Sequence, residues 1–312
     1  MEAQDKQLDI LCMGETLIDF IGQQPGSSIE DTRDYQKFLG GSPTNLAVNA
    51  SRLGLQTALV ATVGDDGFGN YIAKRLREEN VQIRFLRKLK QASTSVIFVS
   101  RTDGTPEFVP FREADYQISP DQIQSEVLEN TKIFHTTCFA LSRNPARSTI
   151  LSEASKAVEA GCQLSIDVNY AGKLWDNREE ALKVIESYCK FDPLVKVSED
   201  DMNRLFERQV THREVFEYFG DVGVSTVCLT LGSRGVKLCL NGKEVIHKNA
   251  IKIDKIQDAT GAGDAFWSGF LYAYIEKNSL EKSLEVGQQL AALKLQSVGR
   301  LPENIKIISK LL

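Results

Sequence analysis

The sequence is poor in the residues that build metal centres, disulfide frameworks and membrane spans. It has 3 histidines and 6 cysteines in 312 residues, and the histidines are dispersed while the cysteines form no Cys-x-x-Cys pair. A zinc site, a disulfide framework and a Ser-His-Asp triad are therefore not expected. No uncharged apolar run approaches the roughly 18 residues of a membrane span, and the polar segment 1–9 lacks the apolar core of a signal peptide. We expect a cytoplasmic protein with reduced, buried thiols and no membrane contact.

An excess of one charge sign and the common phosphate-binding motifs are also missing. Lys and Arg number 37 against 42 Asp and Glu, a net charge of -5 that leaves no basic footprint for nucleic acid. No Walker A motif is present, and a dinucleotide fingerprint would need a third glycine where Phe266 stands. With 42% hydrophobic and 25% charged residues, the composition is that of an ordinary globular protein. Any phosphate site in this chain therefore has to be built in another way.

The stretch 257–266, with the sequence QDATGAGDAF, supplies such a site. Gly261, Ala262 and Gly263 leave a turn with almost no side-chain bulk, so backbone amides can approach a ligand closely. The following residues, 265–275, are strongly apolar and predict a buried helix that begins near Gly263. The unpaired amides and the positive dipole end of a helix N-terminus favour an anion such as phosphate.

Asp264 lies at the start of this predicted helix, and its carboxylate has two interpretations. It could cap the helix, which is the usual role of an Asp before an apolar run. It could also accept the proton of a hydroxyl group that attacks a bound phosphate. The two glycines and the second carboxylate, Asp258, favour the functional interpretation.

A second glycine turn lies near the N-terminus. Gly40 and Gly41 precede a predicted helix that ends at Gly54, and Asn45 in its first turns can donate to and accept from sugar hydroxyls. Asp19 follows the apolar first strand, 10–13, and ligands bind at the carboxyl ends of strands in open α/β sheets. Asp19 is therefore a candidate contact for a polar substrate, although an Asp in a solvated loop would look the same.

Strands and helices alternate along most of the chain, which predicts an α/β fold with a doubly wound, mostly parallel sheet flanked by helices. The expected strands of the sheet are 10–13, 57–63, 133–136, 164–168, 194–197 and 227–231. Residues 93–111 break the alternation with two β-rich runs around Asp103-Gly104, which predicts a hairpin. No linker or internal repeat divides the chain, so we expect one domain over residues 1–312.

The two glycine motifs, in this order and at this separation, resemble those of the ribokinase-like (PfkB) family of carbohydrate kinases. The similarity extends to residues 63–69 and 230–235 and so covers nearly the whole chain. It implies an ATP-dependent sugar kinase that uses Mg²⁺ and, in some members, a monovalent cation such as K⁺. It also implies a small β-sheet lid over the sugar, contributed by about 21–42 and 88–114, and a possible homodimer formed through that lid.

The resemblance implies a role for each residue of the motifs. Asp264 is the expected base, and Gly261, Ala262 and Gly263 form the expected anion-binding turn. The expected sugar-binding residues are Asp19, Gly40, Gly41, Asn45, Arg112 and Asn169. The expected nucleotide-binding residues are Ser198, Thr230, Gly232 and Gly235, and Asp201 is the expected Mg²⁺ ligand through a water molecule.

Several of these residues also have a purely structural interpretation. Arg112 at the end of a strand is otherwise a surface charge, and Asn169 after a strand is otherwise a turn former. The glycines of residues 230–235 could serve a plain connection between strands. The acidic residues 199–201 are typical of a helix N-terminus whether or not they bind a metal.

The choice of sugar depends on weaker similarities. Residues 167–175 and 196–201 are most similar to bacterial fructokinases and 2-keto-3-deoxygluconate kinases, except that Ala171 stands where those enzymes usually carry Arg. We therefore expect a fructokinase, with a sugar-acid kinase as the first alternative and a nucleoside kinase as the second. A sugar-binding protein without catalytic activity is the alternative from a different class.

Overall fold

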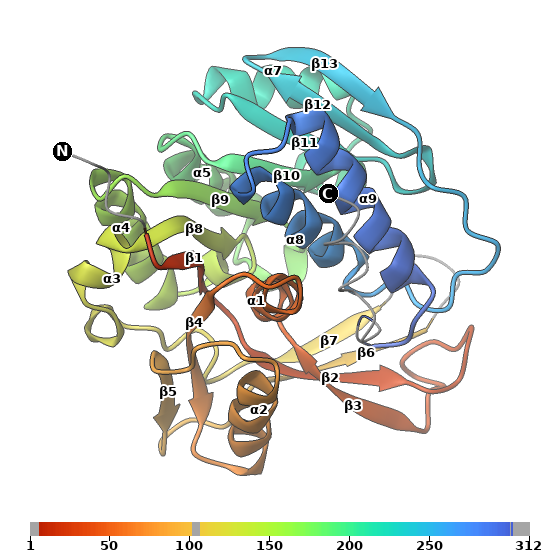
Figure 1. Ribbon diagram of the computed structural model, residues 1–312. Coiled ribbons are helices and arrows are strands. Elements are labelled where there is room, and N and C mark those ends of the chain that lie inside the picture. The colour runs from red at the N-terminus through yellow and green to blue at the C-terminus, as the bar shows by residue number, and fades with distance from the viewer. Residues whose placement is uncertain (1–5, 102–106, 300, 302–312) are drawn as a thin grey trace.

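The centre of the fold is a nine-stranded sheet, in a computed structural model that describes residues 6–101, 107–299 and 301 (Figure 1). Its strand order is β13-β12-β11-β10-β9-β8-β1-β4-β5. The strands are β1 Leu8–Met13, β4 Thr57–Gly64, β5 Leu86–Leu89, β8 Thr131–Thr137, β9 Gln163–Val168, β10 Leu194–Ser198, β11 Thr226–Thr230, β12 Val236–Leu240 and β13 Lys243–Lys248. The pairs from β11 through to β5 are parallel, and β12 and β13 extend the edge antiparallel.

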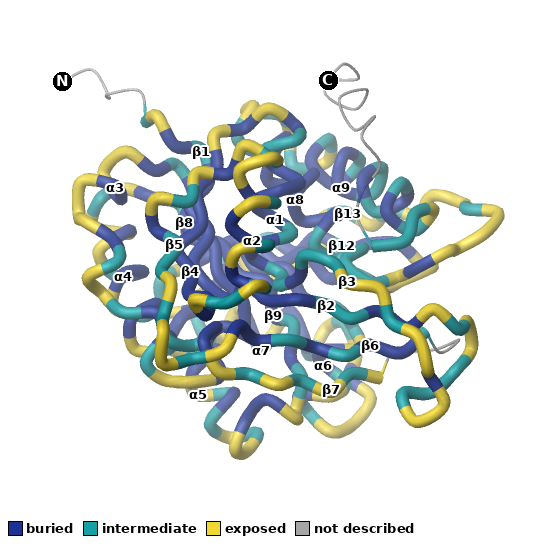
Figure 2. The backbone as a smooth tube through the Cα atoms, turned by 90° about the horizontal axis from the view of Figure 1, so that it is seen from below, coloured by how far each residue is buried: buried dark blue, intermediate teal, exposed yellow. Residues whose placement is uncertain are grey.

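Helices cover both faces of this sheet and bury a separate hydrophobic core on each. One core contains residues of α3 Ser125–Glu129, α4 Ala146–Glu159, α5 Arg178–Cys189, α6 Glu199–Phe206 and α7 His212–Asp221. The other contains residues of α1 Ser42–Arg52, α2 Gly67–Glu78, α8 Ala262–Ile275 and α9 Leu280–Leu295. Because both faces are covered, central strands are continuously apolar, and all eight residues of β4 are buried (Figure 2).

The order of the strands creates the crevice in which ligands of such sheets bind. From β1 the chain continues to β4 and β5 on one side, and it later returns through β8 to the other side. Segments that leave β1 and β8 at their carboxyl ends therefore diverge, and the space between them is open to a ligand. Residues after β1, β8, β9 and β10 all face this one edge of the sheet.

A second, four-stranded sheet with the order β3-β2-β6-β7 lies beside that edge (Figure 1). Its strands are β2 Leu17–Gly22, β3 Tyr35–Gly40, β6 Val96–Val99 and β7 Phe108–Phe111. Residues that pair across strands share a face of the sheet. Asp19 pairs with Phe38 and Ile97, whereas Phe20 pairs with Lys37 and Phe98 on the opposite face.

The predicted fold class is confirmed, including the antiparallel hairpin of β6 and β7. Three details differ from expectation. Asp19 lies inside β2 of the small sheet and not in a loop after the first strand, and β5, part of which lies in the expected lid segment, pairs with β4 in the large sheet. Helix α2 begins at Gly67, earlier than the range 70–80 that the sequence predicts, because the Asp66 side chain accepts a hydrogen bond from the Gly69 amide and caps the helix there.

Two other features bear on the expectations. All 6 cysteines are free and buried, as predicted. None of the helices within the described residues is long and apolar enough to cross a membrane. The expected Asp103-Gly104 turn and a helix expected over 302–312 lie outside the described residues.

Candidate active site

Asp264 lies where the N-termini of α1 and α8 meet. Its Oδ1 accepts a hydrogen bond of 2.7 Å from the Ser42 hydroxyl, and its Oδ2 accepts one of 2.8 Å from the Asn45 amide. The carboxylate is therefore held by α1, a helix more than two hundred residues away in the sequence, rather than used to cap its own helix. The positive ends of two helix dipoles stabilise its negative charge. Its position is thus controlled by the fold.

Asp19 and the turn at Gly40 approach the same place from the small sheet. A Cβ atom at Gly40 would lie 2.3 Å from Oδ2 of Asp19, so only glycine leaves room for this carboxylate. Burial raises the pKa of Asp19 to about 7, and the neighbouring carboxylates of Asp264 and Asp258 contribute to the rise. A carboxyl group whose pKa is shifted by burial and by other acids is typical of a functional site.

Glu15, which sequence reasoning missed as a site residue, links the two motifs to the large sheet. It lies after β1 and is 2% exposed. Its Oε1 accepts from the Ser42 amide at 3.0 Å, and its Oε2 accepts from the Thr137 hydroxyl at 2.8 Å. Burial raises the pKa of Glu15 to about 8, although these hydrogen bonds and the charge of Arg112 lower it. The only sequence signal was its place directly after a buried strand.

Arg112 is buried, so its interpretation as a surface charge is wrong. Its side chain is 2% exposed and forms an ion pair with Asp115, with Nη2 2.7 Å from Oδ2. Nη1 donates to the Ser142 hydroxyl at 2.6 Å, and the guanidinium lies 4.2 Å from the centre of the Phe139 ring. Asn169 contacts the same segment, because its Oδ1 accepts from the Phe139 amide at 3.1 Å.

A buried ion pair lies directly beside the anion-binding turn. Lys196 of β10 donates to both carboxylate oxygens of Asp167 at 2.9 Å, and the two residues are 5% and 2% exposed. A Cβ atom at Gly263 would lie 2.7 Å from Nζ of Lys196, so the ammonium group lies against the turn. Burial lowers the pKa of Lys196, but Asp167 and Asp201 raise it more, and the group is cationic. Burial raises the pKa of Asp167 to about 7, which Lys196 opposes.

The expected nucleotide-binding residues line one cavity of about 580 Å³ on the other side of this turn. Thr230, Gly232, Gly235 and Ser198 lie around it with Asp201, Lys196, Ala262 and Gly263. Helix α9 contributes an apolar wall that includes Ala291 and Leu295. The cavity therefore combines the positive turn and an ammonium group at one end with apolar surface that an aromatic base can contact.

The expected metal ligand has a structural task in this arrangement. Ser198 is the N-cap of α6, and Asp201 completes a capping box by accepting from the Ser198 amide at 3.2 Å. The other carboxylate oxygen of Asp201 accepts from Arg204. Within the described residues, no three His, Cys, Asp or Glu side chains form a group that could hold a metal ion. Mg²⁺ does not need such a group, since it commonly keeps several waters and binds substrate phosphates.

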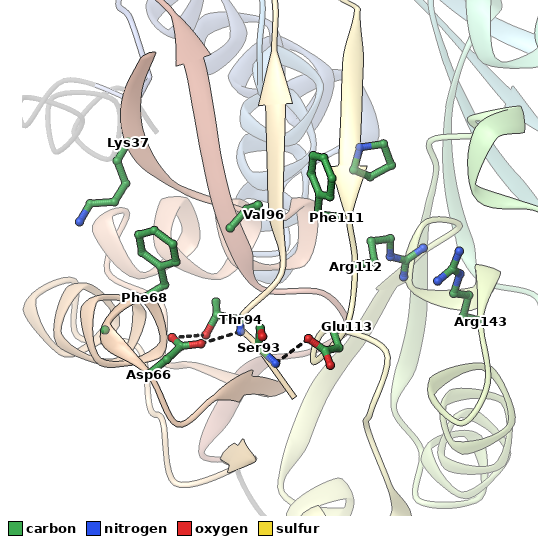
Figure 3. Close-up of a pocket in the computed structure, with 12 residues that line it drawn as sticks. Lys37, Asp66, Phe68, Ser93, Thr94, Val96, Phe111, Arg112, Glu113 and Arg143 are labelled. Atoms are coloured by element: carbon green, nitrogen blue, oxygen red, sulfur yellow. Dashed lines mark hydrogen bonds between the residues drawn. The ribbon is translucent and has the colours of Figure 1, made fainter. Parts of the chain in front are cut away.

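A larger pocket, of about 1070 Å³, does not contain this site (Figure 3). It is lined by Lys37, Val96 and Phe111 of the small sheet and by Phe68 of α2. Val96 pairs with Phe111 and with Ile18, so these side chains lie on the face opposite to Asp19. Of the residues expected in the active site, only Arg112 also borders this pocket.

The arrangement as a whole suits phosphoryl transfer to a hydroxyl group. A carboxylate lies between two glycine turns, polar groups of the small sheet lie on one side of it, and a cavity with a cationic end lies on the other. These are the positioning and charge-stabilising elements that such a reaction requires.

Comparison with known proteins agrees with this chemistry. The model of the family described as "pfkB family carbohydrate kinase" matches residues 7–304, and the chain belongs to that family. It is 37% identical over 298 residues to the ATP-dependent 6-phosphofructokinase of Thermoanaerobacterium thermosaccharolyticum, covering 95% of this chain and 91% of that protein. The chain is therefore a sugar kinase.

Two fructokinase structures are also similar. That of Halothermothrix orenii has 34% sequence identity and a TM-score of 0.80, with 90% of this chain and 98% of that chain covered. That of Vibrio cholerae O395, a double mutant in a fructose, ADP and potassium ion bound form, has 24% identity and a TM-score of 0.82, with 95% and 94% covered. Because its identity is low, the similarity to the Vibrio cholerae structure shows a shared fold and nothing more.

The raised pKa of Glu15 predicts a specific pH dependence of stability. The pKa of Glu15 is about 8 in the folded protein against an ordinary value of 4.5, so the folded state binds the extra proton between these values. Its contribution to the free energy of unfolding therefore falls as pH rises through that range. In Glu15→Gln this contribution is absent. Relative to wild type, the free energy of unfolding of the variant should therefore increase by about 1 kcal/mol for each unit by which pH rises within that range. Denaturant unfolding at several pH values measures the difference.

A matched control is Glu159→Gln on α4, where the side chain is exposed. Its unfolding curves should follow those of the wild type at every pH. If the stabilities of Glu15→Gln and wild type run parallel across the range, the carboxyl group of Glu15 is not the buried acid described here.

Proposed function

We propose that this sugar kinase transfers the γ-phosphoryl group of ATP to a hydroxyl group of fructose. The observation that carries the proposal is the position of Asp264, held by Ser42 and Asn45 at 2.7 and 2.8 Å between the two glycine turns. A carboxylate fixed at that point can take the proton of a hydroxyl whose oxygen attacks phosphorus. The similarity to fructokinases over nearly the full chain supports fructose as the acceptor.

In this mechanism the sugar lies between the small sheet and the crevice of the large one. Its hydroxyl groups are bound by Asp19, Gly40, Gly41, Asn45, Arg112 and Asn169. The reacting oxygen forms a bond to the γ-phosphorus while the bond from this phosphorus to the bridging oxygen of ADP breaks, and its proton passes to Asp264. The small sheet acts as a lid, because closing it removes water that would otherwise hydrolyse ATP.

The residues around the nucleotide cavity fit ATP and Mg²⁺. Thr230, Gly232, Gly235 and Ser198 border the space for the phosphates, and the amides of Ala262 and Gly263 stabilise charge on the group in transit. When bound, Mg²⁺ neutralises phosphate charge. Asp201 is the candidate partner of this ion. It would act through a water molecule, because both of its carboxylate oxygens already accept hydrogen bonds from the protein.

Lys196 adds a fixed positive charge to this mechanism. Its ammonium lies against Gly263 and opens on the nucleotide cavity, and Asp167 holds it there. A cation that is positioned before the reaction stabilises the negative charge that develops on the transferring group. Asp167 is then a positioning residue for Lys196.

Fructose 6-phosphate is a second candidate acceptor, because the relative with 37% identity is named a 6-phosphofructokinase. Arg143 and Arg112 both lie against the ring of Tyr116, with their guanidinium carbons 5.4 and 5.9 Å from its centre. Figure 3 shows the side chains of Arg112 and Arg143 next to each other at the edge of the larger pocket. Two guanidinium groups so close could bind a second phosphate on the acceptor. Arg112 already pairs with Asp115 and Ser142, which favours the unphosphorylated sugar.

An assay of ADP release over a panel of acceptors tests the function directly. The panel contains fructose, fructose 6-phosphate, 2-keto-3-deoxygluconate and a nucleoside, and fructose should give the highest kcat/KM. Asp264→Asn should lower kcat by roughly 10²- to 10⁴-fold, because the base is lost. Asp221→Asn on α7, an exposed residue away from the site, should leave it unchanged. A folded Asp264→Asn variant with wild-type turnover contradicts the mechanism. If fructose 6-phosphate gives the highest kcat/KM, the acceptor is fructose 6-phosphate and not fructose.

Substitution of Lys196 tests the second part of the mechanism. Lys196→Met should lower kcat by roughly 10²- to 10³-fold, as loss of one preorganised charge-stabilising group does, with little change in KM for the sugar. Because this variant leaves Asp167 buried and unpaired, the double variant Lys196→Met/Asp167→Asn removes both charges and restores folding stability. It should remain as inactive as the single variant. Recovery of wild-type kcat in the double variant would show that the pair is only structural.

We also propose a homodimer formed through the outer face of the small sheet, the face opposite to Asp19. Phe20, Phe98 and Phe111 lie side by side on it. The ring centres of Phe20 and Phe98 are 5.0 Å apart, and those of Phe98 and Phe111 are 6.0 Å apart. Phe111 is 59% exposed. The pocket on this face carries both signs of charge, since Lys37 and Asp66 both line it, and this allows the same surface of a second copy to be complementary.

Phe111→Asp should convert the dimer to a monomer, because it places a charge in the centre of the apolar contact. Light scattering after size-exclusion chromatography gives the mass. Val158→Asp on α4, which is 41% exposed and lies on another element, is the control and should not change the mass. A wild-type protein that is already monomeric, or a dimeric Phe111→Asp variant, contradicts this interface.

A further inference from the structure

Lys294, near the end of α9, lies buried beside the anion-binding turn. Its side chain is 4% exposed. Its ammonium is 3.3 Å from Oδ2 of Asp258 and donates to the backbone carbonyl of Ser297 at 3.2 Å. A Cβ atom at Gly261 would lie 3.7 Å from Cε of Lys294, so the side chain packs against the turn itself. The active-site mechanism described above gives this lysine no task.

The carboxylate that Lys294 contacts organises the turn. Oδ1 of Asp258 accepts from the Thr260 amide at 2.9 Å, and Oδ2 accepts from the Gly299 amide at 3.0 Å. Asp258 therefore joins the start of the turn to the segment that follows α9. Its side chain is also 4% exposed, and a carboxylate buried to this degree needs a cation nearby.

Other negative charges gather at the same place. Asp258 and Asp264 both act on Asp19, whose pKa they raise together with burial. The charge of Asp264 also acts on Lys294. Lys196 supplies a positive charge on the Gly263 side of the turn, and the Lys294 ammonium is the positive charge beside Asp258 on the Gly261 side.

We propose that Lys294 is a cation tethered to the chain that takes the place of a K⁺ ion beside the anion-binding turn. The inference rests on the proposed kinase function. A carboxylate oxygen and a backbone carbonyl oxygen are the kind of ligands that a hard monovalent cation takes, and here the ammonium of Lys294 already binds both. An ammonium group and K⁺ carry the same charge and are similar in size. The residues at this place therefore do not fit an additional K⁺ ion, and turnover does not depend on one.

In this view Lys294 is a positioning residue. It neutralises Asp258, which keeps the Thr260 amide and hence Gly261 to Gly263 in the geometry that binds phosphate. It also adds a positive field beneath the turn without touching the substrate. A purely structural ion pair would have the same contacts, and its loss would lower folding stability without making turnover depend on the cation in solution.

Two substitutions of different size separate these possibilities. Lys294→Ala removes the charge and leaves space next to the oxygens of Asp258 and Ser297, which a small cation can enter. Lys294→Met removes the charge but fills the space. Lys183→Ala on α5, where the side chain is exposed, is the matched control for loss of a lysine.

The experiment compares turnover with K⁺, with ammonium and with the bulky tetramethylammonium as the only monovalent cation. Wild type and Lys183→Ala should be equally active in all three. Lys294→Ala should lose roughly 10- to 100-fold in kcat in tetramethylammonium, as expected for a coupling of this kind, and regain most of it in K⁺ or ammonium. Lys294→Met should be equally impaired and not regain activity. Strong activation of the wild type by K⁺, or equal activity of Lys294→Ala in all three salts, overturns the proposal.

A thermal unfolding measurement keeps this test independent of the kinase assay. The Tm of Lys294→Ala should rise when K⁺ replaces tetramethylammonium, because binding of an ion to the folded state stabilises it. The Tm of the wild type and of Lys294→Met should not change by this amount. If the wild type phosphorylates no acceptor but these Tm shifts occur, the proposed function fails while the cation site stands. If phosphorylation is observed and the Tm of Lys294→Ala is insensitive to K⁺, the cation site is wrong and the function stands.

Discussion

The contact on which the rest of the site depends is the pair of hydrogen bonds from Ser42 and Asn45 to Asp264. It joins the first turn of α1 to the first turn of α8, and both helices pack on the same face of the large sheet. Two helix N-termini then point at one carboxylate, so their dipoles add where a phosphate and a hydroxyl have to meet. The glycine turns, the small sheet and the nucleotide cavity are all placed relative to this junction.

The site gathers acids, and the fold compensates for them with cations from separate elements. Asp167 is paired with Lys196 of β10, Asp258 with Lys294 of α9, and Arg112 lowers the pKa of Glu15. Buried charges of this kind gain little stability overall, because desolvation offsets most of the attraction. These ion pairs instead hold charged groups in fixed positions. Lys196 and Lys294 each fix a positive charge next to the anion-binding turn before a substrate arrives, which is what preorganised electrostatic catalysis requires.

The small sheet has two faces with different chemistry. One carries Asp19 toward the crevice of the large sheet, and the other carries Phe20, Phe98 and Phe111 with an exposed edge. The period of two along a strand makes this possible, since neighbouring residues point to opposite faces. It also places the larger pocket on the aromatic face, opposite to Asp19.

The sequence by itself determined the alternating fold. It also singled out the two glycine turns and made Asp264 a candidate base. All of these depend on local signals: apolar runs, turns without side chains and a helix start. The sequence could not determine the contacts of Glu15, Lys196 and Lys294, since a single charged residue in or next to an apolar segment has no local pattern and its partner lies in another element. It likewise put Asp19 after the first strand, although pairing with β3 and β6 places it in the small sheet. Strand pairing and buried charge pairs are long-range contacts, and only the tertiary structure decides them.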